Sequence, residues 1–185
     1  MTKKHLHIVR RLESFLSLTK LVNEIGSEIK TQILEQKVIE SNRIVSHYLK
    51  LPIASKVFYV SRLRIIDGEP STIETSYIPY DLVEGIENAD LTNKSLYQFL
   101  EDEYNIKINK AKEELIIIKP SKQEKELLKL NDEEKVLMIK GINMDFEDKI
   151  VEYSENVAVY DLYIFKGWLK WKNIYKLCIY NWQNQ

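Results

Sequence analysis

The sequence contains few of the residues that build disulfides, metal sites and flexible linkers. Among its 185 residues are one cysteine (Cys178), five glycines and four prolines. A single cysteine cannot form an intramolecular disulfide and cannot build a zinc site alone. The scarcity of glycine and proline argues against a disordered or low-complexity chain. The length therefore predicts one globular domain, large enough to bury a core without such cross-links.

An excess of charge and a long apolar run are also missing. The chain has 27 basic and 28 acidic side chains, giving a net charge of −1. Such a balance gives no sign of a nucleic-acid-binding or polybasic membrane protein. No apolar run reaches the roughly 18 residues of a membrane-spanning helix, and residues 1–11 lack the apolar centre of a signal peptide. We therefore expect a cytoplasmic protein without a membrane partner.

Sequence motifs of common enzymes are absent as well. The chain has no glycine-rich phosphate loop and no G-x-S-x-G, H-E-x-x-H or C-x-x-C motif. The three histidines lie early in the chain, in patterns typical of exposed positions (His5, His7 and His47). Paired carboxylates occur only in charged stretches, which is weak support for acid–base chemistry. We therefore expect no catalytic residue, no cofactor and no metal.

Hydrophobic periodicity predicts an α+β fold. Segments with helical patterns lie at residues 18–25, 41–48, 95–104 and after residue 121. Segments with the composition or alternation of strands lie at residues 29–39, 56–66, 72–78, 115–119, 135–144 and 149–159. Asp67-Gly68 joins two of these strands and predicts a tight hairpin, because such a turn needs positive φ angles. The order of elements indicates a mostly antiparallel sheet with flanking helices.

Hydroxyl residues mark the expected helix starts. Ser41 is expected to cap the second helix, and Ser95 and Ser121 each have a glutamine or glutamate three residues later, the spacing of a capping box. A helix start offers backbone N–H groups and the positive end of the helix dipole. Thr19, at the opening of the first helix, and Ser95 are therefore candidates for contacting an anion. Ordinary capping is the alternative role for Ser95.

Two arginines in the strand predicted at residues 56–66 form the clearest candidate binding site. Arg62 and Arg64 are two positions apart, so in a strand they point to the same face. Two adjacent cations on a partly apolar surface resist desolvation, and a bound phosphate or carboxylate would remove that cost. The alternative is that both extend to water or pair with an acid such as Glu74 on the returning strand.

The order and spacing of several motifs resemble a known family. Residues 62–70 (RLRIIDGEP) followed by 74–79 (ETSYIP) are similar to the UTRA effector-binding domain of GntR-type bacterial transcription regulators, in their HutC subfamily. Further agreement lies at residues 15–26, 95–97, 100–101, 127–128, 151–154 and 161–165. The resemblance thus covers about residues 15–165.

The resemblance implies a chorismate-lyase-like α+β fold that binds a ligand and performs no catalysis. Members sense small metabolites such as sugar phosphates, amino sugars or carboxylates, and bind DNA as homodimers. In the sugar-phosphate sensors, the matching positions around the phosphate are those of Thr19, Arg62, Arg64 and Ser95. The positions of Tyr97 and Glu152 face the rest of the ligand. Leu162 stands where the family usually has arginine.

The family comparison also suggests a division of the chain. We expect residues 1–14 to be a residual linker from a missing N-terminal DNA-binding domain, and residues 15–165 to be the ligand-sensing domain. Residues 166–185 form an aromatic and basic extension that could cover a sheet edge, join a dimer interface or contact a partner. DNA would be bound only through a winged helix-turn-helix domain that this chain lacks.

The functional hypothesis is an effector-binding and dimerisation domain of a GntR/HutC-type transcription regulator, expected to be a repressor, that senses an anionic metabolite such as a sugar phosphate. Two alternatives remain open at this point. One is a lyase-like enzyme on the same fold, and the other is a purely structural dimerisation module.

Overall fold

Two sheets and four α-helices make up the part of the chain that the computed structural model describes, residues 7–11 and 16–167. The larger sheet is antiparallel and has the strand order β2-β3-β4-β7-β6-β5. Its strands are β2 (Ile29–Glu40), β3 (Lys56–Ile66), β4 (Glu69–Pro79), β5 (Lys110–Ile118), β6 (Val136–Met144) and β7 (Ile150–Val159). The α+β class and the mostly antiparallel sheet predicted from the sequence are confirmed.

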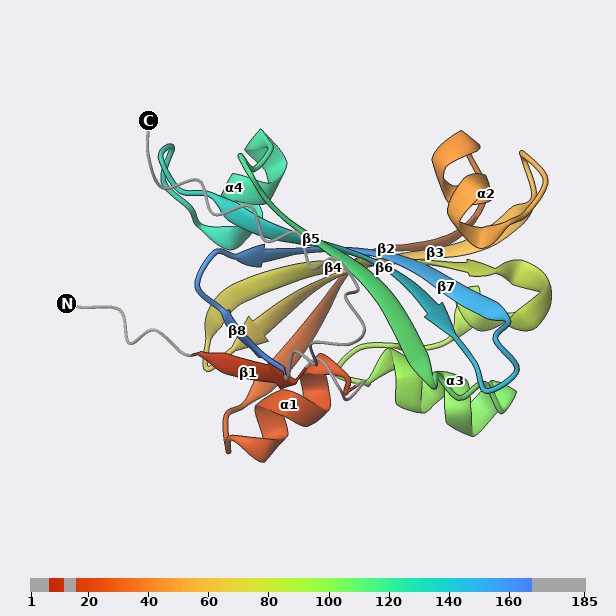
Figure 1. Cartoon of the computed structure of the whole chain (residues 1–185), viewed down its shortest axis with the longest axis horizontal. Helices are drawn as coiled ribbons and strands as arrows, with labels where there is room; N and C mark the ends of the chain where they lie inside the picture. Colours follow the sequence, from red (N-terminus) through yellow and green to blue (C-terminus); the bar gives the residue numbers. More distant parts are fainter. Residues whose placement is uncertain (1–6, 12–15, 168–185) are drawn as a thin grey trace, which may run out of the picture.

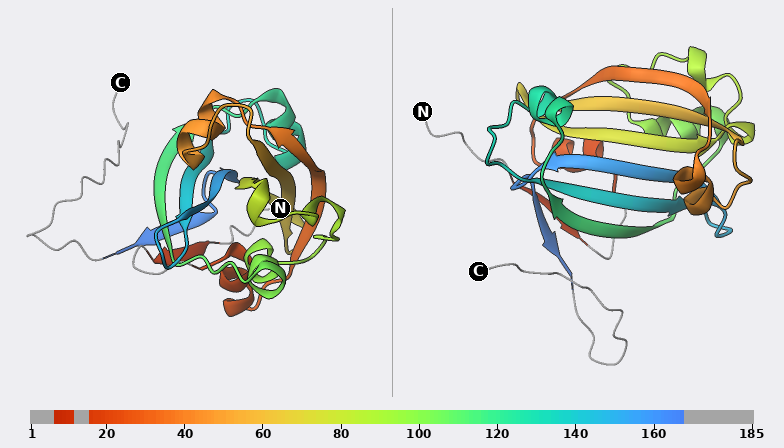
Figure 2. Two further views of the ribbon diagram at one scale, coloured as in Figure 1. Left: turned by 90° about the vertical axis from the view of Figure 1, so that its right-hand side faces the viewer. Right: turned by 90° about the horizontal axis from the view of Figure 1, so that it is seen from above.

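The remaining elements are arranged on the two faces of this sheet (Figure 1). Helices α2 (Arg43–Leu49) and α4 (Lys122–Leu128) lie on one face, over its two ends. Helices α1 (Leu18–Glu24) and α3 (Leu96–Tyr104) lie on the other. Strands β1 (Ile8–Arg11) and β8 (Tyr163–Lys166) form a parallel pair on the side of α1 and α3. In the end-on view of Figure 2 the sheet curves around α1, α3 and this pair, so these elements lie on its concave side.

The concave side is filled by two separate apolar clusters. One packs α3 and two short 3₁₀ turns (Tyr80–Leu82 and Ile86–Asn88) against Phe58 and Val60 of β3. The other packs α1 and β1 against the far end of the same strand. The middle of the concave face lies between the two clusters, and its side chains are polar.

The hairpin between β3 and β4 places the key polar residues. Asp67 and Gly68 have φ angles of 49° and 85°, as the Asp-Gly signal predicted. This turn sets a register in which Arg62 lies directly opposite Glu74. Because side chains alternate along a strand, Arg62, Arg64 and Glu74 all point to the concave face.

Of the three helix caps expected from the sequence, one is confirmed in full and two differ in detail. The N-cap of α2 is Asn42, whose side chain accepts hydrogen bonds from two backbone N–H groups, while the Ser41 hydroxyl pairs with the Ser46 hydroxyl instead. Ser121 forms the full capping box. Ser95 accepts from the backbone of Gln98, but the Gln98 side chain donates to Asp102, so the box at α3 is one-sided.

Two strands begin earlier than predicted. Strand β4 starts at Glu69, directly after the turn, although Pro70 and Ser71 lack strand propensity. Strand β5 starts at Lys110 because its first half also pairs with β6 at the sheet edge, where exposed residues alternate with half-buried ones. The described helices include none long and apolar enough to cross a membrane. Cys178 and nearly all of the aromatic extension predicted at residues 166–185 lie outside the described residues.

Candidate functional site

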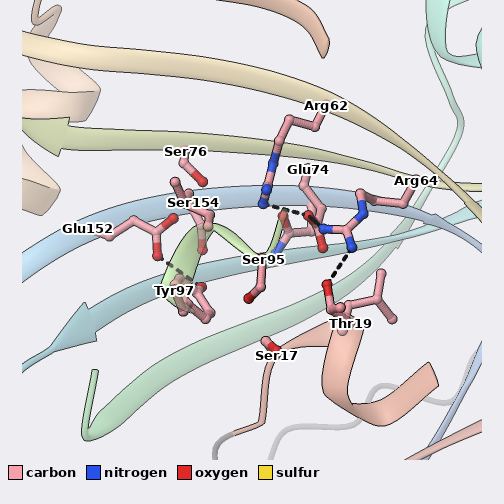
Figure 3. Close-up of a pocket in the computed structure, with 13 residues that line it drawn as sticks. Ser17, Thr19, Arg62, Arg64, Glu74, Ser76, Ser95, Tyr97, Glu152 and Ser154 are labelled. Atoms are coloured by element: carbon pink, nitrogen blue, oxygen red, sulfur yellow. Dashed lines mark hydrogen bonds and ion pairs between the residues drawn. The ribbon is translucent and has the colours of Figure 1, made fainter. Parts of the chain in front are cut away.

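A polar cavity lies in the middle of the concave face, between the start of α1 and the start of α3 (Figure 3). Its empty volume, including the part open to solvent, is about 330 Å³. The floor comes from three neighbouring strands and the walls from the two helix starts. The lining residues are Ser17, Leu18, Thr19, Arg62, Arg64, Glu74, Ser76, Ser95, Leu96, Tyr97, Glu152, Ser154 and Asn156.

All six residues that the sequence nominated for a binding site line this one cavity. They come from four elements, and they are Thr19, Arg62, Arg64, Ser95, Tyr97 and Glu152. Their convergence is a geometric fact about this fold.

At one end of the cavity, the two arginines share one carboxylate (Figure 3). Glu74 Oε2 accepts hydrogen bonds from Arg62 Nη2 at 2.8 Å and from Arg64 Nη1 at 2.9 Å. Arg64 Nη2 also donates to the Thr19 hydroxyl at 2.6 Å. The pairing with Glu74 that the sequence left open as an alternative is therefore present, and both arginines still line the cavity.

This charge cluster is buried and incompletely paired. The side chains of Arg62, Arg64 and Glu74 are 6%, 3% and 14% exposed. Three of their N–H donors, at Arg62 Nε, Arg62 Nη1 and Arg64 Nε, are buried without a hydrogen-bond partner. Each buried donor without a partner costs about 1–3 kcal/mol. An anion in the cavity could satisfy donors that the protein leaves unused.

Burial and charge act in opposite directions on these groups. Burial alone would raise the pKa of the Glu74 carboxyl, but Arg64 and Arg62 together lower that pKa below its usual value. Burial lowers the pKa of Arg62, and the attraction of Glu74 partly offsets it. Since a guanidinium stays protonated in proteins, the pair holds two positive charges against the single negative charge of Glu74.

A second buried acid lies at the other end of the cavity. Glu152 is 1% exposed. Its Oε2 accepts a hydrogen bond from the Tyr97 hydroxyl at 2.9 Å and from Asn143 Nδ2 at 2.5 Å. Asn143 Nδ2 also lies 3.1 Å from the Tyr97 hydroxyl. The three side chains form one network, which fixes the orientation of Tyr97 and Glu152 at the wall of the cavity.

Burial raises the pKa of the Glu152 carboxyl, although hydrogen bonds from Ser76, Asn143 and Tyr97 and the charge of Arg62 counteract it. Burial also raises the pKa of the Tyr97 phenol well above its usual value, and the nearby Glu152 carboxyl contributes to the same shift. The phenol therefore stays neutral. The two acids of the cavity therefore have pKa values displaced in opposite directions.

Sequence reasoning missed several residues of the site. Ser17 is the true N-cap of α1, and Ser76, Ser154 and Asn156 line the floor. Asn143 supports Glu152 from the neighbouring strand. Like Arg62 and Glu152, the floor residues have even numbers, and alternate positions along these paired strands point to the same face. That parity could have identified them once the register was known.

Gly141 leaves room for the cavity floor. A Cβ atom added there would lie 2.9 Å from Ser154 Oγ, closer than carbon and oxygen tolerate. We expect Gly141→Ala to lower the free energy of unfolding by about 1–3 kcal/mol, as overpacking does. The double variant Gly141→Ala/Ser154→Ala should recover much of that loss in urea denaturation. Equal losses for the single and double variants would show that Ser154 is not what Gly141 accommodates.

Among the described residues, no group of three or more histidine, cysteine, aspartate or glutamate side chains could hold a metal ion. One end of the cavity instead offers cationic and hydroxyl donors. The other end offers the Glu152 carboxyl, which is held by hydrogen bonds from the neutral side chains of Tyr97 and Asn143. This arrangement can bind a small molecule that has an anionic group and further polar groups.

Comparison with known proteins assigns the family. The family model described as the UTRA domain matches residues 24–164. The HTH-type transcriptional regulator GmuR of Bacillus subtilis is 33% identical over 104 residues, which is 56% of this chain and 42% of GmuR. The probable fructoselysine utilization operon transcriptional repressor of Escherichia coli O157:H7 is 28% identical over 125 residues, covering 65% of this chain and 51% of that protein. The chain spans about half the length of these curated relatives.

Solved structures share the fold. The effector domain of PhnF from Mycobacterium smegmatis superimposes with a TM-score of 0.80 at 16% identity, covering 88% of this chain and 99% of that chain. This likeness is evidence for the fold alone, and it agrees with the chorismate-lyase-like arrangement that the sequence predicted. The match of the family model extends over most of the described structure. The chain therefore belongs to the UTRA domain family of GntR-type transcriptional regulators.

Proposed function

We propose that the chain is the effector-binding domain of a GntR-type repressor that works in the cytoplasm and senses an anionic metabolite such as a sugar phosphate. It performs no catalysis. DNA is bound by a separate helix-turn-helix domain, and the chain forms a homodimer. The ligand shifts the population between two dimer geometries and so changes the spacing of the DNA readers.

The observation that carries this proposal is the arginine pair. Two buried guanidiniums face one cavity with a single shared carboxylate and three unpartnered N–H donors. Thr19 and Ser95 add hydroxyl groups from the two helix starts. The fork of arginine suits the planar or tetrahedral oxygens of carboxylate and phosphate. An anion at this position would use donors that otherwise cost the protein stability.

The rest of the cavity supports a ligand with several polar groups. Ser76, Ser154 and Asn156 offer hydroxyl and amide groups on the floor, and Glu152 and Tyr97 lie beyond them. Such a lining is suited to the hydroxyl groups of a sugar. A relative named as a repressor of fructoselysine utilization is consistent with a sugar-derived effector.

Calorimetric titration against a panel of sugar phosphates and sugar carboxylates tests the proposal. We expect at least one member to bind, and its affinity to fall strongly in the double variant Arg62→Ala/Arg64→Ala. Mass spectrometry after long incubation should recover the ligand unchanged, whereas turnover would favour the lyase-like enzyme. Absence of any ligand-induced thermal shift would favour a purely structural dimerisation module.

A further inference from the structure

The charges around the cavity are balanced before any ligand enters. Arg62 and Arg64 face Glu74 and Glu152 across the same cavity. A further ion pair lies beside them, in which Arg10 Nη2 of β1 contacts Glu113 Oε1 of β5 at 2.7 Å. Three guanidiniums thus stand against three carboxyls in one largely buried region. An anionic ligand would disturb this balance unless another negative charge is removed.

Only one of these groups is placed to lose its charge. The guanidiniums stay protonated. Glu74 is held in its ionised form by two arginines at 2.8 and 2.9 Å, and Glu113 is paired with Arg10. Glu152 Oε2, by contrast, accepts its hydrogen bonds from the neutral groups Tyr97 and Asn143. A buried carboxylate held by neutral donors is costly to keep ionised.

We propose that an anion entering the arginine pair binds together with one proton from solvent, and that this proton goes onto the Glu152 carboxylate. This inference rests on the proposed function and adds to it the protonation state of the occupied site. The step changes no covalent bond other than the new O–H bond of Glu152. The added proton cancels one negative charge of the ligand. The net charge of the occupied cavity therefore changes by one unit less than the charge of the ligand.

The structure provides an acceptor for that proton. Asn143 is 2% exposed, and its Oδ1 atom is buried without a hydrogen-bond partner. The same amide already donates through Nδ2 to Glu152. A carboxylic acid at Glu152 could therefore donate to Asn143 Oδ1 or to an oxygen of the ligand. The site then favours an anion whose remaining groups are neutral oxygens, such as the hydroxyl groups of a sugar.

The electrostatic surroundings act in the same direction. Burial already raises the pKa of Glu152, and the positive charge of Arg62 is among the factors that hold it down. An anion at Arg62 would offset that charge, so the pKa would rise further. The charged and titratable groups around Glu152 and the arginine pair are Arg10 on β1, Arg62 and Arg64 on β3, Glu74 on β4, Tyr97 on α3, Glu113 on β5 and Tyr163 on β8.

Sulfate is the probe that isolates this effect, because it does not titrate near neutral pH. Calorimetric titrations at constant ionic strength would run from about pH 5.5 to about pH 8.5, above the usual pKa of a glutamate. We expect the affinity to fall as the pH rises, approaching about tenfold per pH unit where Glu152 is ionised in the empty protein. Titrations in buffers of different ionisation enthalpy should show up to about one proton taken up per sulfate.

Two variants show which group takes the proton. Glu152→Gln keeps the shape of the side chain but cannot titrate, so its sulfate affinity should be independent of pH. Glu155→Gln, on the same strand but bonded to Tyr153 and away from the cavity, should keep the wild-type profile. Sulfate binding that depends on Arg62 and Arg64 but takes up no proton would overturn this inference and leave the proposed function standing. Sulfate binding unaffected by those arginines, or none, would overturn both.

Discussion

Replacing Arg64 by methionine is expected to weaken binding of the best sugar phosphate at least about thirtyfold. Arg64 contacts both Glu74 and the Thr19 hydroxyl, so it joins the sheet, the carboxylate and the start of α1 at one point. Truncating one member of a buried, hydrogen-bonded charge pair costs about 2–5 kcal/mol of binding free energy. Methionine keeps the apolar stem and much of the volume, so the loss should reflect the missing guanidinium. Calorimetry on the purified chain measures it directly.

Two further variants separate the guanidinium fork from positive charge in general. Arg64→Lys retains the charge but replaces the planar guanidinium fork with a single nitrogen, so its affinity should lie between those of wild type and Arg64→Met. Arg43→Met removes an exposed arginine at the start of α2, on the opposite face of the sheet, and should bind as wild type does. If Arg64→Met and Arg43→Met bind equally well, the arginine pair is not the anion site.

Replacing Glu74 by alanine is expected to lower the free energy of unfolding by about 3–5 kcal/mol, since it leaves two buried guanidiniums without their shared carboxylate. The effect should depend on pH in a defined direction. The pKa of Glu74 is lowered in the folded protein, so its stabilising contribution is present at neutral pH and is lost as the pH falls through the folded value. The difference between wild type and variant should therefore shrink in acid.

A small carboxylate should partly rescue this variant. Acetate or formate can occupy the space that the Glu74 side chain vacates and pair with both arginines. Either anion should then raise the thermal midpoint of Glu74→Ala more than that of wild type at the same ionic strength. Glu35→Ala, which breaks a half-exposed ion pair with Lys37, should have little effect on stability and gain nothing from acetate. Equal responses of both variants to acetate would contradict the assigned role of Glu74.

The sequence was sufficient to predict the part of the fold where local signals are strong. Strand β3 spans residues 56–66, as its strand-forming composition predicted, and the Asp67-Gly68 turn sets the register of the hairpin. Strand β5 was predicted too short because charged side chains obscure a strand that the neighbouring strand holds in place. Competing caps were also hard to rank, since Ser41 and Asn42 are both good N-caps and the structure uses Asn42.

The candidate site was predictable where it follows from a family resemblance, from two residues on one strand or from hydroxyl groups at helix starts. The arginine pair was visible as two residues on one face, and Glu74 was visible as a possible partner. The supporting role of Asn143 depends on the pairing of β6 with β7, which lie far along the chain from the arginines. No local pattern marks an asparagine as the support of a distant buried acid.

The most direct test of an anion site at the arginine pair is a crystal structure of the chain grown or soaked with selenate, whose anomalous scattering locates the anion without ambiguity. We expect an anomalous peak in the cavity, within hydrogen-bond distance of the unpartnered N–H groups of Arg62 and Arg64 and near Thr19 or Ser95. A cavity empty of selenate, with the peak at another ordered site on the protein, would contradict it.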